Sequence, residues 1–262
     1  MLQLSNMPFK KSLALSPLEE RAKINELHAS LGTMTEVESK FCTDACLHRY
    51  LIATNWSKKK AGKMIKDTLK WRDLYKPQHV EWEEISKEAE AGKIYRANFR
   101  DRNGRTVLVM RPGVENTGNL EGQLRYLVFC MENAITNLPP DQEQMVWLVD
   151  FEGWNMSMIP LKTAREIANV LQNHYPERLA YAILYNPPKV VEVFWNVIRP
   201  FLDPSTQKKV KFVYANDEGG QKLMESLFDL DMLECAFGGR NRCKFNKDDY
   251  VVSMKKDNGK PV

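Results

Sequence analysis

Three polar side chains stand just before two short apolar runs that have the composition of buried strands. Glu177 precedes residues 181–185 in "HYPERLAYAILYNPP", and Thr206 and Lys209 precede residues 210–215 in "FLDPSTQKKVKFVYA". If these strands are parallel neighbours, their amino ends meet at one edge of a sheet and the three side chains converge there. The ammonium and the hydroxyl suit a phosphate, and the carboxylate can accept hydrogen bonds from the hydroxyls of a polyol.

The same residues also fit an ordinary protein surface. Glu177 and Lys209 could form an exposed ion pair worth less than about 1 kcal/mol. Ser205 and Thr206 could belong to a simple turn or cap after Asp203. Open α/β sheets, moreover, usually bind ligands at the carboxyl ends of their strands. From these residues alone both interpretations stay open, and a site at the amino ends would differ from a nucleotide crevice.

The elements that would position these residues alternate along the chain. Apolar runs predict strands at residues 106–110, 145–150, 181–185 and 210–215, and helical patterns lie between them at 120–138, 160–174 and 188–202. This βαβαβαβ order implies a largely parallel sheet with right-handed crossovers. Ahead of it, "GKIYRANFRDRNGRTVLVM" predicts two strands around a turn at Asn103 and Gly104.

The first third of the chain is predicted to be helical. Its first helix has Ser16 as N-cap, Pro17 at the first helical position and Glu19 three residues after the cap, and it ends at Gly32. Apolar residues then recur with helical spacing over 43–55 and 57–75.

These patterns predict a domain organisation. We expect a flexible N-terminus at 1–15, a helical domain at 16–78, an α/β domain at 90–246 and a tail at 247–262. The last residues of the tail, "KKDNGKPV", are expected to be disordered.

One predicted helix has more apolar surface than a surface helix needs. In "VVEVFWNVIRPFLD" the polar residues occupy an arc of about 60°, and apolar residues cover about 200°. The apolar residues include Val190, Val191, Phe194, Trp195, Val197, Ile198 and Phe201. Periodicity alone fits a buried crossover helix as well as it fits a lid over an apolar ligand.

Composition limits the classes of protein to consider. The 262 residues are 43% hydrophobic, and lysine and arginine exceed aspartate and glutamate by 38 to 34, which gives a net charge of +4. Such a charge permits an anionic surface as partner, whereas a nucleic acid usually needs more, so none is expected. Because no apolar run approaches about 18 residues and no signal peptide is evident, we expect a soluble cytoplasmic protein.

The motifs of common catalytic sites are absent from the sequence. It contains no GxGxxG, no GxxxxGK[ST], no GxSxG and no HExxH, and its four histidines lie far apart. We therefore expect no catalytic residue, no metal site and no cofactor. A pair such as Cys130 with His174 keeps an α/β enzyme with an unrecognised site open as an alternative.

Several motifs in a fixed order resemble the CRAL-TRIO lipid-binding family, in particular its phosphatidylinositol-transfer branch. They are "VWLVDFEGW", "HYPERL", "LYNPP", "RPFLDPSTQKKVKF" and "LECAFGGR", and the resemblance covers roughly residues 36–246. It implies an α/β fold of the CRAL-TRIO type, in which an all-helical N-terminal unit packs on a mostly parallel sheet domain. That domain would enclose an apolar lipid pocket, and "PPKVVEVFWNVIRPFL" would be the helical gate that closes it.

The resemblance also implies roles for particular residues. Glu177 stands where the family's inositol contact stands, and Thr206 and Lys209 stand where its phosphate contacts stand. Thr54 replaces an arginine that assists phosphate binding elsewhere in the family, and Lys58 to Lys60 could supply the missing charge. Hydroxyl residues that contact phosphatidylcholine in some members are replaced by Met145 and Trp147, which puts such a second site in doubt.

The function implied by the resemblance is lipid carriage without catalysis. We expect a cytoplasmic monomer that binds phosphatidylinositol or another phospholipid, uses no cofactor, and exchanges its ligand at a membrane surface that it contacts transiently. A first alternative keeps the fold but assigns another hydrophobe, a sterol or isoprenoid, that the protein senses or presents to a partner. The α/β enzyme is the alternative from another class.

Overall fold

The chain divides into two units, Met1–Lys66 and Asp67–Val262. The computed structural model describes residues 15–114, 119–155, 157 and 161–258. Helix α4, Lys58–Tyr75, begins in the first unit and ends in the second.

The first unit is helical, as predicted. It contains α1 (Pro17–Leu31), α2 (Glu36–Phe41), α3 (Asp44–Ala53) and the beginning of α4. Ser16 caps α1, because its hydroxyl accepts the Glu19 N–H at 3.4 Å while the Glu19 carboxylate accepts the Ser16 N–H at 2.7 Å. Gly32 ends the helix with a φ of +80° that favours glycine. The predicted start and end of this helix are therefore confirmed.

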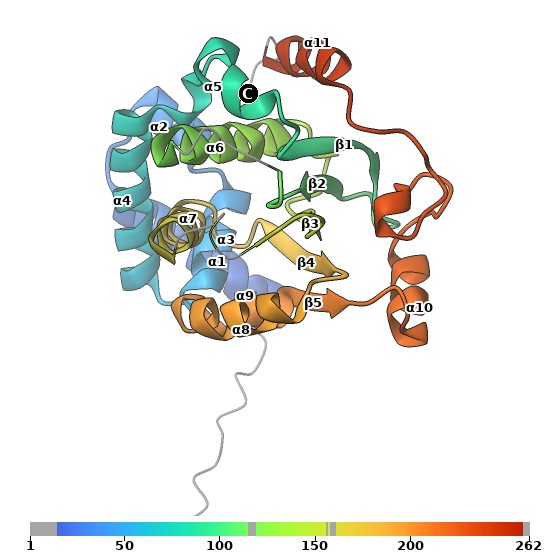
Figure 1. Cartoon of the computed structure of the whole chain (residues 1–262). Coiled ribbons are helices and arrows are strands. Elements are labelled where there is room, and N and C mark those ends of the chain that lie inside the picture. Colours follow the sequence, from blue (N-terminus) through green and yellow to red (C-terminus); the bar gives the residue numbers. More distant parts are fainter. Residues whose placement is uncertain (1–14, 115–118, 156, 158–160, 259–262) are drawn as a thin grey trace, which may run out of the picture. The chain divides into compact units, whose positions relative to one another are not determined.

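A five-stranded sheet forms the centre of the second unit (Figure 1). Its strands are β1 (Ile94–Arg100), β2 (Thr106–Met110), β3 (Met145–Asp150), β4 (Leu179–Tyr185) and β5 (Val210–Val213). They lie in sequence order; β1 runs antiparallel to β2, and the remaining neighbours are parallel. The mixed α/β class and the mostly parallel sheet predicted from sequence are confirmed.

Helices and short 3₁₀ segments connect the strands and flank them. They are η1 (Pro77–His79), α5 (Trp82–Ala89), α6 (Leu120–Thr136), α7 (Leu161–His174), α8 (Lys189–Ile198), η3 (Arg199–Phe201), α9 (Pro204–Lys209), α10 (Glu218–Leu227), η4 (Cys235–Phe237) and α11 (Lys247–Asn258). The sequence patterns predicted α6 and α7 but not α5, α9, α10 or α11.

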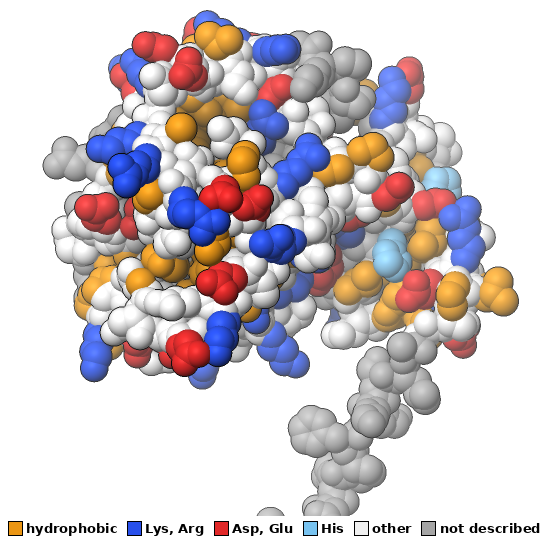
Figure 2. Space-filling model, turned by 90° about the vertical axis from the view of Figure 1, so that its right-hand side faces the viewer, with side chains coloured by type: hydrophobic (Ala, Val, Ile, Leu, Met, Phe, Trp, Pro, Cys, Tyr) orange, Lys and Arg blue, Asp and Glu red, His pale blue; other side chains and the backbone are white. Residues whose placement is uncertain are grey.

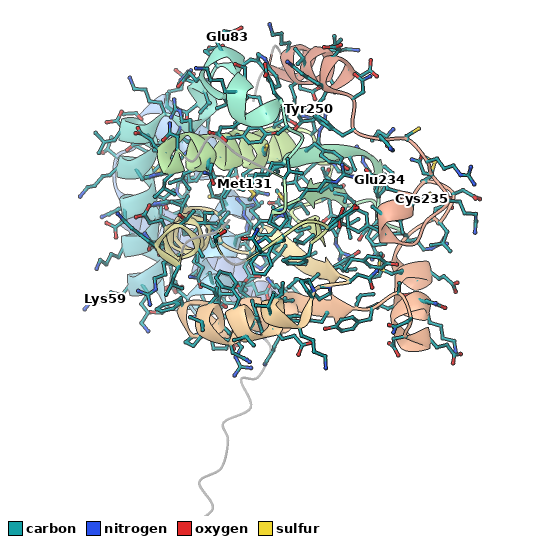
Figure 3. The ribbon with its side chains drawn as sticks, viewed as in Figure 1. Lys59, Glu83, Met131, Glu234, Cys235 and Tyr250 are labelled. Atoms are coloured by element: carbon teal, nitrogen blue, oxygen red, sulfur yellow. The ribbon has the colours of Figure 1, made fainter. Side chains whose placement is uncertain are left out.

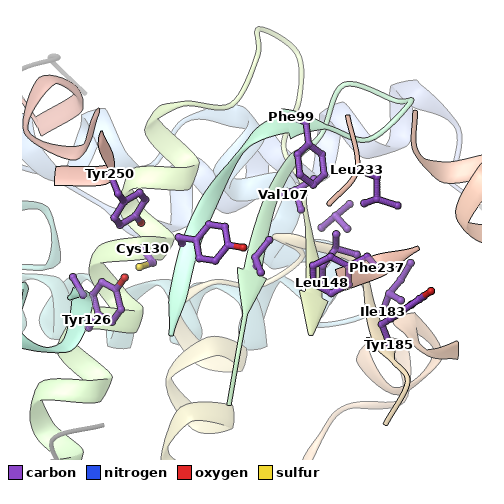
Figure 4. Close-up of a cluster of buried hydrophobic side chains, with 14 of the residues drawn as sticks. Phe99, Val107, Tyr126, Cys130, Leu148, Ile183, Tyr185, Leu233, Phe237 and Tyr250 are labelled. Atoms are coloured by element: carbon purple, nitrogen blue, oxygen red, sulfur yellow. The ribbon is translucent and has the colours of Figure 1, made fainter. Parts of the chain in front are cut away.

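One face of the sheet contributes to the largest buried cluster of the second unit. Val107, Leu148, Ile183 and Tyr185 on this face form a cluster with Phe237 of η4, whose ring meets that of Tyr185 at 5.8 Å (Figure 4). Neighbouring members of the cluster include Phe99, Leu233, Met224 and Phe228. The strand residues of this face alternate with those of the opposite face, since successive side chains of a strand point to opposite sides.

The other face of the sheet is covered by helices and carries two further apolar clusters. Leu108 and Met145 pack against Leu127 of α6 and Val170 of α7. Toward β5, Ala182 and Leu184 pack against Val191 of α8. The parallel register puts Leu108, Trp147, Ala182 and Val210 in one row and Met110, Val149, Leu184 and Phe212 in the next.

The predicted continuous helix over residues 188–202 is interrupted. The α-helix ends at Ile198, a 3₁₀ turn follows at Arg199–Phe201, and Leu202 is extended with φ −100° and ψ 145°. Pro200 lies in that turn, and its missing N–H cannot continue the hydrogen-bond ladder of an α-helix. The apolar arc of the sequence pattern is therefore divided between α8 and a separate turn.

The expectation that residues 255–262 are disordered is wrong for residues 255–258. Helix α11 includes Lys255 to Asn258, and residues 259–262 lie outside the described residues. Tyr250 and Met254 of this helix are buried in the cluster that also holds Tyr126 and Cys130. Their burial explains why a polar segment with few apolar residues is ordered.

Candidate functional site

The predicted site residues lie at the amino edge of β4 and β5. Glu177 precedes β4 by two residues, and Lys209 is the last residue of α9, directly before β5. The two strands are parallel, and Ala182 pairs with Val210. Their amino ends are consequently neighbours, as the sequence predicted.

Glu177 and Lys209 contact each other directly. The Lys209 Nζ lies 2.6 Å from the Glu177 Oε2, and both side chains are largely buried, with 18% and 16% of their surface exposed. Glu177 has a φ of +57°, a conformation that residues other than glycine rarely adopt. Gln144 donates to its backbone carbonyl at 3.4 Å. The pair is thus more enclosed than the exposed ion pair considered from the sequence.

Thr206 is on the same short helix as Lys209 but is bonded elsewhere. Its hydroxyl donates to the Asp203 Oδ2 at 2.5 Å. Asp203 is the N-cap of α9, because its Oδ1 also accepts the N–H groups of Ser205 and Thr206, each at 2.9 Å. Of the three predicted residues, the structure brings two into contact and keeps the third in the helix cap.

Two glutamines that the sequence interpretation missed hold the segment between α8 and α9 in place by hydrogen bonds. The Gln172 Oε1 on α7 accepts the Asp203 N–H at 2.7 Å, and its Nε2 donates to the Phe201 carbonyl at 2.8 Å. The Gln207 Nε2 donates to the carbonyls of Arg199 and Leu202 at 3.1 and 2.8 Å. No residue type or spacing in the sequence distinguishes these glutamines from ordinary surface residues.

A further polar contact holds the first half of α8. The Tyr214 hydroxyl, just after β5, donates to the Glu192 Oε1 at 2.5 Å. This bond to a carboxylate, with a smaller effect of burial, raises the pKa of Tyr214 to about 12. Helix α8 is therefore tied by hydrogen bonds near its start and just beyond its end.

The apolar residues of α8 divide between its two sides. Val191 and Ile198 are buried, and Phe194 and Trp195 are half-buried. The Phe194 ring meets Trp154 edge to face at 5.8 Å, and the Trp195 ring meets Phe212 at 6.2 Å. On this side α8 covers the apolar face of β4 and β5.

The outer side of α8 also carries apolar groups. Val193 and Val197 have 59% and 46% of their surface exposed, and Val190 and, in η3, Phe201 are exposed as well. Spacings of three and four residues place Val190, Val193 and Val197 in one stripe along α8, and Phe201 follows in the turn after the helix. Lys189, Arg199 and Lys208 are charged, exposed residues of the same region.

Two tryptophans beneath α8 carry buried donors without partners. Within the residues that the structure describes, the indole Nε1 atoms of Trp147 and Trp154 are shielded from solvent and have no hydrogen-bond acceptor. An unpaired buried donor typically costs about 1–3 kcal/mol. The sequence interpretation singled out Trp147 only because it stands where some family members have a hydroxyl residue, and it did not single out Trp154.

A separate cavity of about 790 Å³ lies at the opposite, carboxyl edge of β2 and β3. Its lining includes Arg111, Asp150, Glu234, Cys235, Arg242 and Cys243. Glu234 directly precedes η4 and Cys235 is its first residue, on the side of the sheet where α10 stands (Figure 3). Seen from that side, basic and acidic side chains are interspersed (Figure 2).

The charged groups in this cavity largely neutralise one another. The Arg111 Nη2 donates to Glu234 at 3.0 Å, and the Tyr95 hydroxyl lies 2.9 and 2.8 Å from the two oxygens of the same carboxylate. Burial raises the pKa of Glu234 despite these bonds. The contacts join β1 and β2 to the segment around η4, so we interpret them as structural.

The described residues contain neither a candidate metal site nor a candidate membrane-spanning helix. Among these residues, no cluster of three or more His, Cys, Asp or Glu side chains could hold a metal ion. No helix in the described part of the chain is long and apolar enough to cross a membrane.

Comparison with protein families identifies the relatives of this chain. Residues 89–239 match the CRAL/TRIO domain, and residues 19–67 match the CRAL/TRIO N-terminal domain. The chain belongs to the CRAL/TRIO family. A crystal structure of Sfh5 has the same CRAL/TRIO fold, with a TM-score of 0.69 at 17% identity over 93% of this chain and 98% of that one.

Curated members of the CRAL/TRIO family extend the comparison. A CRAL-TRIO domain-containing protein of Schizosaccharomyces pombe is 35% identical over 218 residues, 83% of this chain and 21% of that protein. Phosphatidylinositol transfer protein PDR17 of Saccharomyces cerevisiae is 31% identical over 245 residues, 88% of this chain and 67% of that protein. Phosphatidylinositol transfer protein CSR1 of Eremothecium gossypii is 24% identical, and the match covers 80% of this chain and 49% of that protein. The chain thus spans between about a fifth and two thirds of the length of these relatives.

Proposed function

We propose that this CRAL/TRIO protein is a non-enzymatic carrier that binds phosphatidylinositol under α8 and exchanges it at membrane surfaces. The observation that carries the proposal is the position of α8, which covers an apolar sheet face and leads directly into the helix that holds Lys209. The proposed limits of its two domains are residues 16–78 and 90–246. The similarity to PDR17 and CSR1, both named phosphatidylinositol transfer proteins, supports the choice of lipid.

The apolar face beneath α8 would hold the acyl chains. Each CH₂ removed from water contributes about 0.8 kcal/mol, so a two-chain lipid needs a large apolar environment in place of the bilayer. Val191, Phe194 and Trp195 occupy the space over β4 and β5. A lipid would therefore take their place as α8 moves outward.

The pair formed by Glu177 and Lys209 would receive the headgroup. A lysine ammonium binds phosphate as a point charge, and a carboxylate accepts hydrogen bonds from inositol hydroxyls. Phosphatidylinositol would replace the direct contact at 2.6 Å by one contact for each residue. Thr206 would join the site only after its hydroxyl leaves Asp203.

The outer stripe of α8 would contact the membrane when the protein delivers its lipid. Val193 and Val197 already face away from the sheet. Basic residues beside them would favour anionic lipid surfaces, each by about 1 kcal/mol. We propose that the carrier works as a cytoplasmic monomer and uses no cofactor.

One observation favours a second candidate ligand, a neutral hydrophobe such as a sterol or isoprenoid. Lys209 is neutralised by Glu177 and the Thr206 hydroxyl is occupied by Asp203, so a ligand without a charged headgroup would leave the amino edge undisturbed. Such a protein could present its ligand to a partner instead of moving phospholipid.

Transfer between vesicles tests the proposal. Labelled phosphatidylinositol or labelled sterol is placed in donor vesicles, and its arrival in acceptor vesicles is followed with and without the protein. We expect phosphatidylinositol to move and the sterol to stay. Sterol movement alone would favour the second candidate, and movement of neither lipid would contradict carriage.

A further inference from the structure

The two unpartnered indole groups beneath α8 lie on the same apolar surface. Trp154 is a member of the cluster formed with Ala182, Leu184 and Val191, and Trp147 packs against that cluster. Each indole N–H is a donor that cannot accept. Because nearly all buried donors in native proteins are paired, two such groups in one cluster require an explanation.

Helix α8 offers these donors no acceptor where it covers them. It contributes Val191 and Phe194 to the cluster, and both side chains are hydrocarbon. The carbonyls of the helix interior are used by its own hydrogen-bond ladder. An acceptor would have to arrive with a molecule that enters between α8 and the sheet.

We propose that Trp147 and Trp154 donate hydrogen bonds to ester carbonyl oxygens of the bound lipid and thereby select glycerolipids with acyl chains. The inference rests on the proposed lipid-binding function and adds a preference within it. An ester carbonyl is a strong acceptor in the otherwise apolar part of a phospholipid. Dialkyl ether lipids lack that carbonyl, and sterols and isoprenoids offer no acceptor along their hydrocarbon bodies.

The sheet register sets the distance between the two proposed contacts of the lipid. Trp147 pairs with Ala182, which pairs with Val210, the residue that follows Lys209. Neighbouring strands lie about 4.8 Å apart, so two strand spacings separate Trp147 from Val210 by roughly 10 Å. The phosphate would be bound at Lys209 and an ester carbonyl at Trp147. The glycerol backbone of one lipid, together with the lengths of the Lys209 and Trp147 side chains, can span the distance between them.

Competitive loading provides the test. The protein is incubated with phosphatidylcholine vesicles that contain equal amounts of diacyl and dialkyl phosphatidylinositol of the same chain length. It is then re-isolated, and its bound lipids are quantified by mass spectrometry. We expect the unaltered protein to load the diacyl form about tenfold over the dialkyl form, as two hydrogen bonds of ordinary net strength would give.

Phenylalanine substitutions remove the donors while keeping an aromatic ring. The double variant Trp147→Phe with Trp154→Phe should load the two lipids equally within about twofold, and each single variant should keep about a threefold preference. Trp82→Phe is the matched control, because Trp82 and Trp154 each have 7% of their surface exposed but Trp82 belongs to the cluster on the other face of the sheet. It should keep the tenfold preference.

The possible outcomes separate this inference from the proposed function. Equal loading of both lipids by the unaltered protein, or an unchanged preference in the double variant, would overturn the inference and leave phospholipid carriage standing. Loading of neither lipid would overturn both.

A second measurement does not require the double variant to fold. In nitrogen-15-labelled protein with its six tryptophans, NMR reports the indole N–H groups, and the single phenylalanine variants assign the signals of Trp147 and Trp154. These two signals should move downfield on loading with the diacyl lipid and not with the dialkyl lipid. Identical shifts with both lipids would contradict the proposal.

Discussion

The Lys209 ammonium lies 2.6 Å from the Glu177 carboxylate, although 32 residues separate them in the chain. The contact exists because β4 and β5 are parallel neighbours and each residue stands at the amino end of its strand. It occupies the place where we propose that a phosphorylated polyol binds. The ion pair therefore neutralises the proposed headgroup site, and a bound ligand would have to compete with it.

A double-mutant cycle should detect this pair in the free energy of unfolding. Glu177→Gln and Lys209→Met each leave a largely buried charge without its partner, so each should lower the free energy of unfolding by about 1–2 kcal/mol. The double variant should lose less than the sum of the two. Urea unfolding measures all four proteins, and strictly additive losses would contradict a direct pair.

The same site should control transfer of phosphatidylinositol. Lys209→Ala combined with Thr206→Asp removes a cation and adds an anion where the phosphate would lie, so transfer between vesicles should fall at least about tenfold. The circular dichroism spectrum should stay that of the unaltered protein. Lys256→Ala, an exposed position on α11 outside the proposed membrane contact, is the control and should transfer normally. Unchanged transfer by the double variant would refute the headgroup assignment.

The outer stripe of α8 should affect exchange without affecting stability. Val193 and Val197 are exposed, so Val193→Ser with Val197→Ser should change the free energy of unfolding by less than about 0.5 kcal/mol. Transfer should nevertheless slow, because less apolar surface enters the membrane interface. Val252→Ser on α11, which is also highly exposed, should leave transfer unchanged. Equal transfer rates in all three proteins would argue against membrane contact by α8.

The inner aromatic residues of α8 should behave differently from the stripe. Phe194→Ala with Trp195→Ala removes contacts to Trp154 and Phe212 and should lower both stability and exchange. We expect the loss in exchange to exceed what the fraction of unfolded protein explains. If the folded fraction of the variant exchanges lipid at the normal rate, Phe194 and Trp195 serve only to stabilise the core.

The hydrogen bonds that tie α8 should limit how often it moves outward. Tyr214→Phe removes the bond to Glu192, and Gln172→Leu removes two bonds to the turn after the helix. A lost bond of about 1 kcal/mol should speed exchange about fivefold where outward movement limits the rate. Hydrogen exchange by mass spectrometry should show faster exchange over residues 189–203. Slower lipid exchange in both variants would contradict this function of the bonds.

Stability should decrease with acidity through His174. Its ring stacks on Trp71 at 4.2 Å, and burial, assisted by the nearby Arg72 charge, lowers its pKa from 6.5 to about 4. Between these values the unfolded chain binds a proton that the folded chain does not, so stability is lost as the pH falls from 6.5 to 4. After allowing for partial exposure we expect a loss of about 1–2 kcal/mol.

Replacement of the histidine checks the origin of that loss. His174→Gln should be less stable at neutral pH, since it loses the stacking, but its stability should change less between pH 6.5 and 4. Chemical unfolding at several pH values measures both proteins. Parallel curves for the two proteins would assign the acid sensitivity to other groups.

Sequence patterns predicted the sheet well because its central strands β2, β3 and β4 are short apolar runs that are largely buried on both faces. They also predicted that Glu177 and Lys209 meet, since the amino ends of two parallel neighbouring strands lie at the same edge of a sheet. They failed at α8, where apolar periodicity continues past Ile198 but Pro200 and the Asp203 cap divide the segment. They could not find Gln172, Gln207 or the unpaired Trp154 donor, because these depend on tertiary neighbours.

Mass spectrometry of the lipid that co-purifies with the protein tests the central proposal most directly. The protein is expressed in cells that contain phosphatidylinositol, phosphatidylcholine and sterols, and it is analysed intact and after lipid extraction. Our account predicts one diacyl phosphatidylinositol per chain, and its loss in the variant Lys209→Ala with Thr206→Asp. A sterol or isoprenoid as the bound molecule, retained in that variant, would contradict it.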